Sequence, residues 1–435
     1  MTPSGAAPPR TEPDRFFPGI DGLRATAAFL VLTFHVAERA GLNRADTTSW
    51  VADYTSQFGR LGVSIFFAIS GFLLYRPFVA AHLTGRPSPA LGSYFRRRFL
   101  RIFPAYWLAL VGYALLAAPA LRDSIVDHLL LRVSLLQGWS DTLALSGVSV
   151  AWTLTIELTF YLVLPLYAWL VRRLGASLGR DQMFTAELIG LGAFYLLGLL
   201  GRWLLADKVL PIGGLAPWTD LFAMGMVIAV FRARQRNGGG TPAVFKYLGR
   251  YPVLGLVLAL ELVWVVALLD VPRGFQPKTL GDEYARHFLY GFVGFALLTP
   301  LVFGNQAKGW YRRALCWRPV RWTGEVSYGI YLWHVLVLYL LTKDLRPEQV
   351  DFWPTLGATF AITLVVASAS FVLLERPVQR LRFHRVLPVA RRDPASAPEA
   401  TDPGAAAPEA TNPEATSPEA TSPEATTPTA GGPPP

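Results

Sequence analysis

Ten long runs of apolar residues dominate this sequence and constrain its fold more than any other feature. Each is about 18–25 residues long, the length at which an α-helix crosses a hydrocarbon layer of about 30 Å. Because backbone groups in lipid must be paired within the protein, such runs predict helices. We therefore expect an all-α integral membrane protein, a bundle of about ten transmembrane helices. The runs cover residues 19–40, 58–80, 101–120, 150–171, 183–201, 211–231, 250–270, 286–304, 324–343 and 354–375.

Composition points the same way. Apolar residues make up 52% of the 435 positions and charged residues only 16%, whereas soluble proteins carry about 25% charged residues. Such a chain cannot cover a water-facing surface in the usual way, so the lipid bilayer is its predicted partner. The first run is long, opens with charged residues and follows a proline-rich polar start, which argues against a cleaved signal peptide.

Lys and Arg residues are unevenly distributed among the segments that connect the runs. With ten spans, every second connecting segment lies on the same side of the membrane as the N-terminus. The segments on that side contain 28 of the 40 Lys and Arg residues. Short cytoplasmic segments retain positive charge, so we expect both termini to be cytoplasmic in a bacterial plasma membrane. The net charge of +10 then lies beside the membrane and gives no reason to expect nucleic-acid binding.

The chain divides into three predicted regions. Residues 1–18 form a cytoplasmic N-terminal segment, 19–380 a transmembrane domain, and 381–435 a cytoplasmic tail rich in Pro, Ala, Glu and Thr. The tail cannot bury an apolar core, so we expect it to be disordered. Cys316 is the sole cysteine, and no Cys or His cluster has metal-ligand spacing, so we expect no disulfide within the chain and no metal.

Ionisable residues within spanning helices are costly in lipid and are therefore candidates for function. Arg24 and His35 lie eleven residues apart in the first run, which places them on one helix face about 16 Å apart. Glu157 lies about two turns into the fourth run, at a depth expected to match His35. A carboxylate beside an imidazole can orient it and stabilise its protonated form. We predict that His35, Arg24 and Glu157 are catalytic; the alternatives are snorkelling of Arg24, a packed His35 and a neutral hydrogen-bonding Glu157.

Arg98 and Arg101 precede the third run on the predicted cytoplasmic side, one helical turn apart. Guanidinium groups match the geometry of phosphates, which an acyl-CoA donor carries. We predict that both residues bind this donor. Retention of positive charge in the cytoplasm explains the neighbouring Arg96 and Arg97 equally well.

Three further residues are predicted to contact substrate. Ser70 precedes Gly71 in the second run, where small residues allow a ligand to approach, although helix packing explains the pair at least as well. Tyr331 and His334 lie in an aromatic stretch of the ninth run. A single histidine in an apolar helix is more often structural, so His334 ranks below His35 as a catalyst. The polar segment 271–285 is expected to be an outer loop that contributes to acceptor choice.

These motifs, together and in this order, resemble the acyltransferase-3 family of membrane proteins, which includes O-acetylases of bacterial surface polysaccharides and acylases of macrolides. The resemblance implies ten core helices, a cytoplasmic acyl-CoA donor, His35 as the catalytic histidine supported by Arg24, and Arg98 and Arg101 near the donor. The chain departs from the family pattern at Ser64 and Thr153. The matching segments are Gly19–Arg24 with His35, Gly62–Leu73, Arg98-x-x-Arg101 before Pro104, Trp152–Glu157, Tyr328–His334 and Glu375-x-Pro377.

The sequence thus predicts a membrane-bound O-acyltransferase. It would transfer an acyl group, acetyl or another short chain, from acyl-CoA to a hydroxyl of a carbohydrate, a glycolipid or a secondary metabolite such as a macrolide. His35 would act as general base on that hydroxyl. The alternative from another class is a proton-coupled multi-pass transporter or flippase, in which Arg24, His35 and Glu157 form a relay. Against it, the sequence indicates neither an inverted repeat nor paired broken helices.

Overall fold

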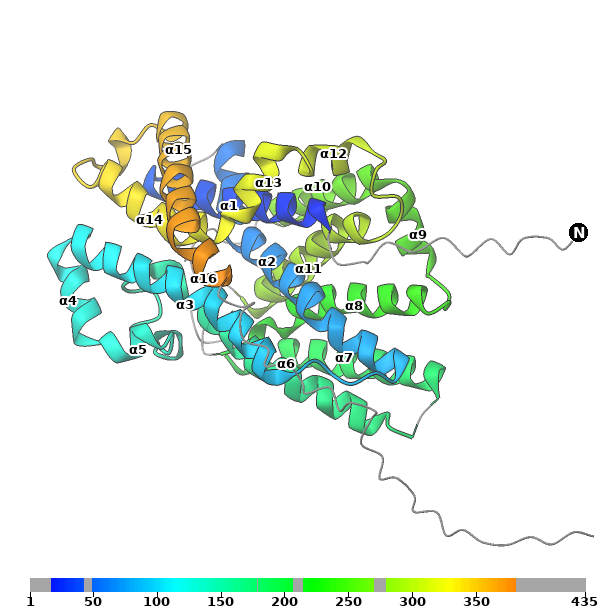
Figure 1. Ribbon diagram of the computed structural model, residues 1–435. Coiled ribbons are helices and arrows are strands. Elements are labelled where there is room, and N and C mark those ends of the chain that lie inside the picture. The colour runs from blue at the N-terminus through cyan, green and yellow to red at the C-terminus, as the bar shows by residue number, and fades with distance from the viewer. Residues whose placement is uncertain (1–16, 43–48, 178, 206–213, 270–278, 381–435) are drawn as a thin grey trace, which may run out of the picture. The chain divides into compact units, whose positions relative to one another are not determined.

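The computed structural model describes residues 17–42, 49–177, 179–205, 214–269 and 279–380. All of these belong to one compact unit, which spans Met1–His384. Within the described ranges the chain is helical and contains no strand (Figure 1), so the predicted all-α fold is confirmed. The predicted tail 381–435 and residues 1–16 lie outside the described residues.

Eight of the described helices are long and apolar enough to cross a membrane, and ten spans result if each of two bent helix pairs is one span. The prediction of about ten transmembrane helices is therefore confirmed. The eight are α1 (Pro18–Arg39), α2 (Trp50–Thr84), α3 (Leu91–Leu116), α6 (Trp152–Leu174), α7 (Arg180–Leu204), α8 (Thr219–Arg236), α11 (Leu280–Val302) and α15 (Phe352–Ser370).

Two helix pairs contradict the expectation that no spans are broken. The axes of α9 (Ala243–Arg250) and α10 (Pro252–Leu268) meet at 105°, and those of α13 (Arg318–Glu325) and α14 (Ser327–Thr342) at 74°. Each pair joins a short arm to a longer apolar arm of 17 or 16 residues. Pro252 at the start of α10 cannot donate a backbone hydrogen bond, so it breaks the helix there.

The short arm α9 is amphipathic. It buries Phe245 and Leu248 and exposes Lys246 and Arg250. Such an arm fits the surface of a membrane, with its apolar side toward the bundle, whereas two charged residues would be costly at the centre of a bilayer. We therefore take the longer arms, α10 and α14, as the spanning parts of these two pairs.

Two helices begin earlier than the apolar runs predict. α2 begins at Trp50 rather than near residue 58, and the Ser49 side chain accepts a hydrogen bond from the Ala52 backbone at 3.1 Å. α11 begins at Leu280, where Thr279 and Asp282 form a capping box. Residues 280–285, which were predicted to belong to the loop 271–285, are therefore helical. Residues 270–278 lie outside the described residues.

Helix α2 is the central packing element of the bundle and contacts α1, α8 and α11. Its approach to α8 depends on two glycines. A Cβ added to Gly225 would lie 1.8 Å from the Ala68 carbonyl oxygen, and one added to Gly71 would lie 2.1 Å from that of Phe222. The backbones of α2 and α8 therefore approach directly, which fixes the position of the α2 side chains.

The segment between α3 and α6 is compact and is held by Arg132, whose side chain is buried. Its guanidinium donates to the backbone and side-chain oxygens of Ser124 and Ser146 at 2.8–3.1 Å. The other short helices connect the spans; they are α4 (Pro119–Asp127), α5 (Leu129–Val133), η1 (Gln137–Trp139), η2 (Ser149–Ala151), η3 (Ala216–Trp218), α12 (Trp310–Leu315), η4 (Pro347–Gln349), η5 (Phe371–Glu375) and α16 (Arg376–Arg380).

Candidate active site

Two cavities lie along opposite halves of α1. The first, here called the arginine cavity, is lined by Arg24 near the N-terminal end of this helix. The second, the histidine cavity, is lined by His35, eleven residues further along, which corresponds to a rise of about 16 Å. Val63 and Tyr331 line both cavities. The two cavities therefore approach each other at these two side chains.

Three guanidinium groups and one carboxylate line the arginine cavity. Arg24 comes from α1, Arg98 and Arg101 from α3, and Glu157 from α6. Arg24 pairs with Asp21 at 3.1 Å, whereas the buried Arg98 Nε has no hydrogen-bond partner among the described residues. Cationic groups outnumber carboxylates on this wall, so it is suited to phosphates. The predicted proximity of Arg98 and Arg101 to one site is therefore observed.

Glu157 is held on the wall of the arginine cavity. The Ser70 hydroxyl and the Tyr161 hydroxyl each donate to Glu157 Oε1 at 2.6 Å. Two donors on one oxygen fix the position of the carboxylate. Ser70 thus lines the cavity and positions Glu157, while the adjacent Gly71 serves helix packing. The packing alternative is thus observed for Gly71, and contact of Ser70 with substrate stays a prediction.

His35 and His334 are direct neighbours. His334 Nε2 lies 3.2 Å from His35 Nδ1, and the two ring centroids are 4.9 Å apart. His35 Nδ1 also lies 2.9 Å from the Val31 carbonyl oxygen, and His334 Nδ1 lies 3.0 Å from that of Ile330. A carbonyl oxygen only accepts, so each neutral ring carries its proton on Nδ1.

This arrangement leaves His35 Nε2 without a proton and without a hydrogen-bond partner among the described residues. A deprotonated ring nitrogen in a cavity wall can accept a proton from a bound hydroxyl. His334 is buried and lines neither cavity, so its geometry is that of a residue that positions His35. The predicted contact of His334 with substrate does not agree with this position.

The structure corrects the predicted grouping of His35, Arg24 and Glu157. Arg24 and Glu157 line the arginine cavity and His35 the histidine cavity. No hydrogen bond or ion pair joins His35 to either residue within the described part of the chain. The expected match in depth between Glu157 and His35 is wrong, because Glu157 lines the same cavity as Arg24, about 16 Å along α1 from His35. The residue that lies beside His35 is His334, from a distant part of the sequence.

Tyr331 lies where the two cavities approach each other, and its contact with substrate stays a prediction. Its hydroxyl is 2.7 Å from Thr153 Oγ1 and donates to the Val150 carbonyl oxygen at 3.2 Å. These contacts tie α14 to the start of α6. Thr153, one of the departures from the family pattern, supplies the same hydroxyl function that serine would supply.

Sequence reasoning missed the charged and amide side chains that line the histidine cavity beside His35, namely Glu38, Gln57, Arg60 and Arg286. Arg60 and Arg286 fall at the edges of apolar runs and were interpreted only through their effect on orientation. Their position within helices was a signal that could have identified them, because ionisable groups in a span require a partner or a cavity. No group of three or more potential metal ligands occurs among the described residues.

The fold and these cavities define a multi-pass membrane protein with a polar site inside its helical bundle. The chain belongs to the acyltransferase family, because the family model described as an acyltransferase domain matches residues 17–375. The resemblance inferred from the motifs is thereby confirmed. No solved structure matches the chain significantly.

Curated relatives come from bacteria. The chain is 24% identical over 395 residues to peptidoglycan O-acetyltransferase OatA of Listeria monocytogenes, an alignment that covers 85% of this chain and 57% of the relative. It is 24% identical over 396 residues to the putative peptidoglycan O-acetyltransferase YrhL of Bacillus subtilis, covering 86% and 56%. The chain thus spans less than three fifths of the length of these relatives. Family and helices together support a multi-pass bacterial membrane protein.

Proposed function

We propose that this chain is a membrane O-acyltransferase that transfers an acyl group from acyl-CoA to a hydroxyl of a bacterial glycan. One observation carries the proposal: a cavity rich in arginine and a cavity containing a histidine base approach each other at Val63 and Tyr331. Transfer between a phosphate-bearing donor and a hydroxyl acceptor requires these two kinds of site side by side. The names of the relatives favour acetyl as the acyl group and a glycan such as peptidoglycan as the acceptor.

The arginine cavity is the proposed donor site. Arg24, Arg98 and Arg101 would bind the phosphates of acyl-CoA, with the thioester directed toward Tyr331. The cavity itself encloses only about 80 Å³, below the several hundred Å³ typical of small-molecule pockets. Most of the coenzyme would therefore lie outside it, toward the membrane surface. With the N-terminal end of α1 in the cytoplasm, as the charge distribution predicts, this surface is the cytoplasmic one.

His35 is the proposed base. Its Nε2 would take the proton of the acceptor hydroxyl, whose oxygen attacks the thioester carbonyl carbon. The carbon–sulfur bond then breaks, and the coenzyme A thiol leaves with the proton that His35 had accepted. His334 would hold the His35 ring, and Glu157 would shape the donor site. Arg24 acts on the donor in this scheme and does not support His35.

The transporter alternative required a relay through Arg24, His35 and Glu157. These residues lie in two cavities, which weakens that alternative. The bent pairs α9–α10 and α13–α14 are the feature that would favour a transporter. Their short arms are charged, however, and suit the membrane surface better than the middle of a transport path.

The test is acyl-CoA turnover by the purified chain in nanodiscs, with wild type compared with His35→Ala. Release of free thiol is followed with a mixture of glycan fragments, glycolipids and a macrolide as acceptors, and donor binding is measured separately. We expect thiol release to vanish in the variant while donor affinity stays the same. Equal release by both proteins would disprove the role of His35. Absence of donor binding by wild type would disprove acyl transfer from acyl-CoA.

A further inference from the structure

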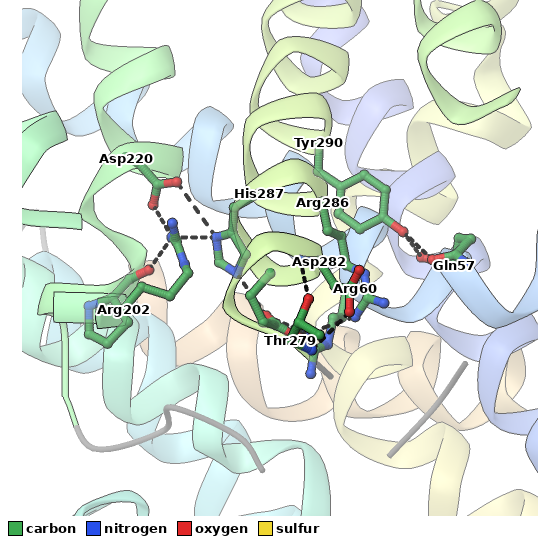
Figure 2. Close-up of polar contacts among 11 residues, drawn as sticks. Gln57, Arg60, Arg202, Asp220, Thr279, Asp282, Arg286, His287 and Tyr290 are labelled. Carbon is green, nitrogen blue, oxygen red and sulfur yellow. Dashed lines mark hydrogen bonds and ion pairs between the residues drawn. The ribbon is translucent and has the colours of Figure 1, made fainter. Parts of the chain in front are cut away.

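The wall of the histidine cavity carries two guanidinium groups that the proposed acyl transfer does not use. Arg60 lies on α2 and Arg286 on α11, and both line the cavity together with His35. Figure 2 shows the two side chains in one polar cluster with Gln57 and Tyr290. The cavity measures about 350 Å³, within the range of small-molecule sites.

The two arginines share one carboxylate. Arg60 Nη1 donates to both oxygens of Glu283, at 2.7 and 2.8 Å, and Arg286 Nη1 lies 3.5 Å from Oε1 of the same group. Glu283 is absent from the cavity wall, so it lies behind the arginines and not between them and the cavity. The wall therefore presents more positive than negative charge at this position.

Arg60 retains a donor for a further partner. Its Nη2 is buried and makes no hydrogen bond among the described residues. The whole side chain is 16% exposed, so bulk water does not fully solvate it. A buried charged donor without a partner destabilises the protein. An anionic ligand in the cavity would remove this cost.

The surroundings hold the arginines in place. Tyr290 OH donates to Gln57 Oε1 at 2.7 Å, which joins α11 to α2 one turn from Arg60. On the other side of α11, His287 contacts the buried ion pair of Arg202 and Asp220, as Figure 2 shows. Side chains fixed in this way bind a ligand with a small loss of conformational entropy.

The remaining ionisable groups of the cavity are His35 and Glu38. His35 donates from Nδ1 to the Val31 carbonyl oxygen, so its neutral ring has Nε2 as the proton acceptor. Glu38, near the end of α1, is the one carboxylate on the wall, against the two guanidinium groups of Arg60 and Arg286. The cavity therefore combines a basic wall with a proton acceptor.

We propose that Arg60 and Arg286 bind a carboxylate or phosphate group of the acceptor and so place its hydroxyl beside His35 Nε2. A guanidinium fork matches the two oxygens of either group. The acceptor class is thus an acidic or phosphorylated sugar. Acylation of the hydroxyl placed beside His35 rests on the proposed function. Binding of the anionic group can be measured without catalysis.

The experiment uses three sugars that differ in charge: N-acetylglucosamine, N-acetylmuramic acid and N-acetylglucosamine 1-phosphate. Their affinities are measured for the full chain carrying His35→Ala in nanodiscs, so that no turnover interferes. We expect the two anionic sugars to bind about 10-fold or more tightly than the neutral one. The ranking of the carboxylate and the phosphate identifies the preferred anion. Equal affinity of all three would overturn the proposal.

Two substitutions distinguish an Arg60 that binds the sugar from an Arg60 that only forms a structural ion pair with Glu283. Arg60→Gln should lower the affinity for the anionic sugars to that for the neutral sugar. Glu283→Gln removes the competing carboxylate, so the anionic sugars should bind as tightly as before or more tightly. A purely structural pair predicts that both substitutions weaken all three sugars alike. If Arg60→Gln does not fold, Arg60→Lys should keep part of the preference, since charge remains and the fork is lost.

Turnover by the chain with His35 intact distinguishes this inference from the proposed function. An anion preference without thiol release from any sugar would leave the binding site in place and disprove acyl transfer to these acceptors. Thiol release that shows the same KM for neutral and anionic sugars would disprove the anion site and leave acyl transfer in place.

Discussion

At the scale of single residues, the hydrogen bonds of two imidazole rings decide which nitrogen of a neutral His35 carries the proton. His35 Nδ1–H has two acceptors, the Val31 carbonyl oxygen and His334 Nε2. His334 therefore does for His35 what a carboxylate does in many hydrolases: it fixes the ring and its tautomer. A neutral acceptor suits an apolar helix better than a carboxylate, because it brings no charge into the bundle.

The role of His334 leads to a prediction about its replacements. His334→Gln offers a side-chain oxygen that can accept from His35 Nδ1, whereas His334→Leu offers none. We expect the leucine variant to lose about 10–100-fold in kcat, as losses of a neighbour that orients a functional ligand often do, and the glutamine variant to recover part of it. The KM for acyl-CoA should remain unchanged in both. If leucine and glutamine reduce kcat equally, the hydrogen bond from His35 has no catalytic value.

Arg98 carries a second prediction. Its side chain lines the arginine cavity, so Arg98→Gln should raise the KM for acyl-CoA about 10-fold through loss of a charge-assisted contact. Arg96→Gln is the matched control, because it removes the same charge from the same helix at an exposed position that lines neither cavity. Steady-state kinetics with varied acyl-CoA measure both. Equal KM values in the two variants would show that only overall charge matters.

The sequence was sufficient to identify individual residues with polar roles, and insufficient to group them. Tyr331 could be selected because polar residues in apolar runs need an explanation, and Arg98 and Arg101 because guanidinium groups match the geometry of phosphates. The contact between His35 and His334 joins positions 299 apart in sequence, and no periodicity within one helix reports such a contact. Arg60 was overlooked because the apolar run was assigned a start at residue 58, which placed Arg60 at the edge of the membrane. The helix in fact begins at Trp50, so Arg60 lies well inside it.

At the scale of helices, close packing of α2 against α8 positions both cavities, since α2 supplies Ser70 to one and Arg60 to the other. Glycine permits this approach, as it does in many membrane helix pairs. The bends were harder to predict than the spans. Pro252 indicated a helix start, but whether the preceding residues continue across the membrane or along its surface depends on the elements against which they pack.

A third prediction concerns the contact between α2 and α8. Gly225→Ala would bring a methyl group to 1.8 Å from the Ala68 carbonyl oxygen, which belongs to a helix backbone and cannot move alone. We expect a loss of about 1–3 kcal/mol in stability or more, seen as a lower unfolding temperature. Gly357→Ala is the control, since nothing lies within 4 Å of the added Cβ. Unchanged stability of Gly225→Ala would mean that the helices are less closely packed than described.

At the scale of the whole molecule, the orientation in the membrane follows from the distribution of positive charge and remains a prediction. Cysteine labelling tests it. Ala90→Cys lies between α2 and α3, on the predicted cytoplasmic side, and Thr142→Cys lies between α3 and α6, on the outer side; both positions are exposed. A membrane-impermeant maleimide applied to intact cells should label position 142 and should label position 90 only after permeabilisation.

The native Cys316 must be replaced by serine in these experiments, although burial raises the pKa of its thiol and slows its reaction. The Cys316→Ser chain without further cysteines then serves as the unlabelled control. Labelling of position 90 but not position 142 in intact cells would invert the orientation, and the arginine cavity would then face away from the cytoplasmic pool of acyl-CoA.

The overall class of fold could be predicted from the sequence because the length of an apolar run is a property of the sequence alone. The arrangement of the helices could not, since lipid-facing and core-facing sides are both apolar in most of these spans. What the sequence did not reveal is the division of the polar residues into two cavities, which depends on the contacts of α2 with the helices around it.

The meeting of the two cavities at only two side chains, Val63 and Tyr331, has a consequence for the energy metabolism of the cell. A continuous water-filled path would let ions run down the membrane potential, which is worth about 2.3 kcal/mol per elementary charge at 100 mV. An acyl group is neutral and small, so it can pass from one side to the other at this point while the bulky, charged coenzyme stays behind. In the proposed acyl transfer, the acyl group would thus reach an acceptor on the other side without a continuous path for ions.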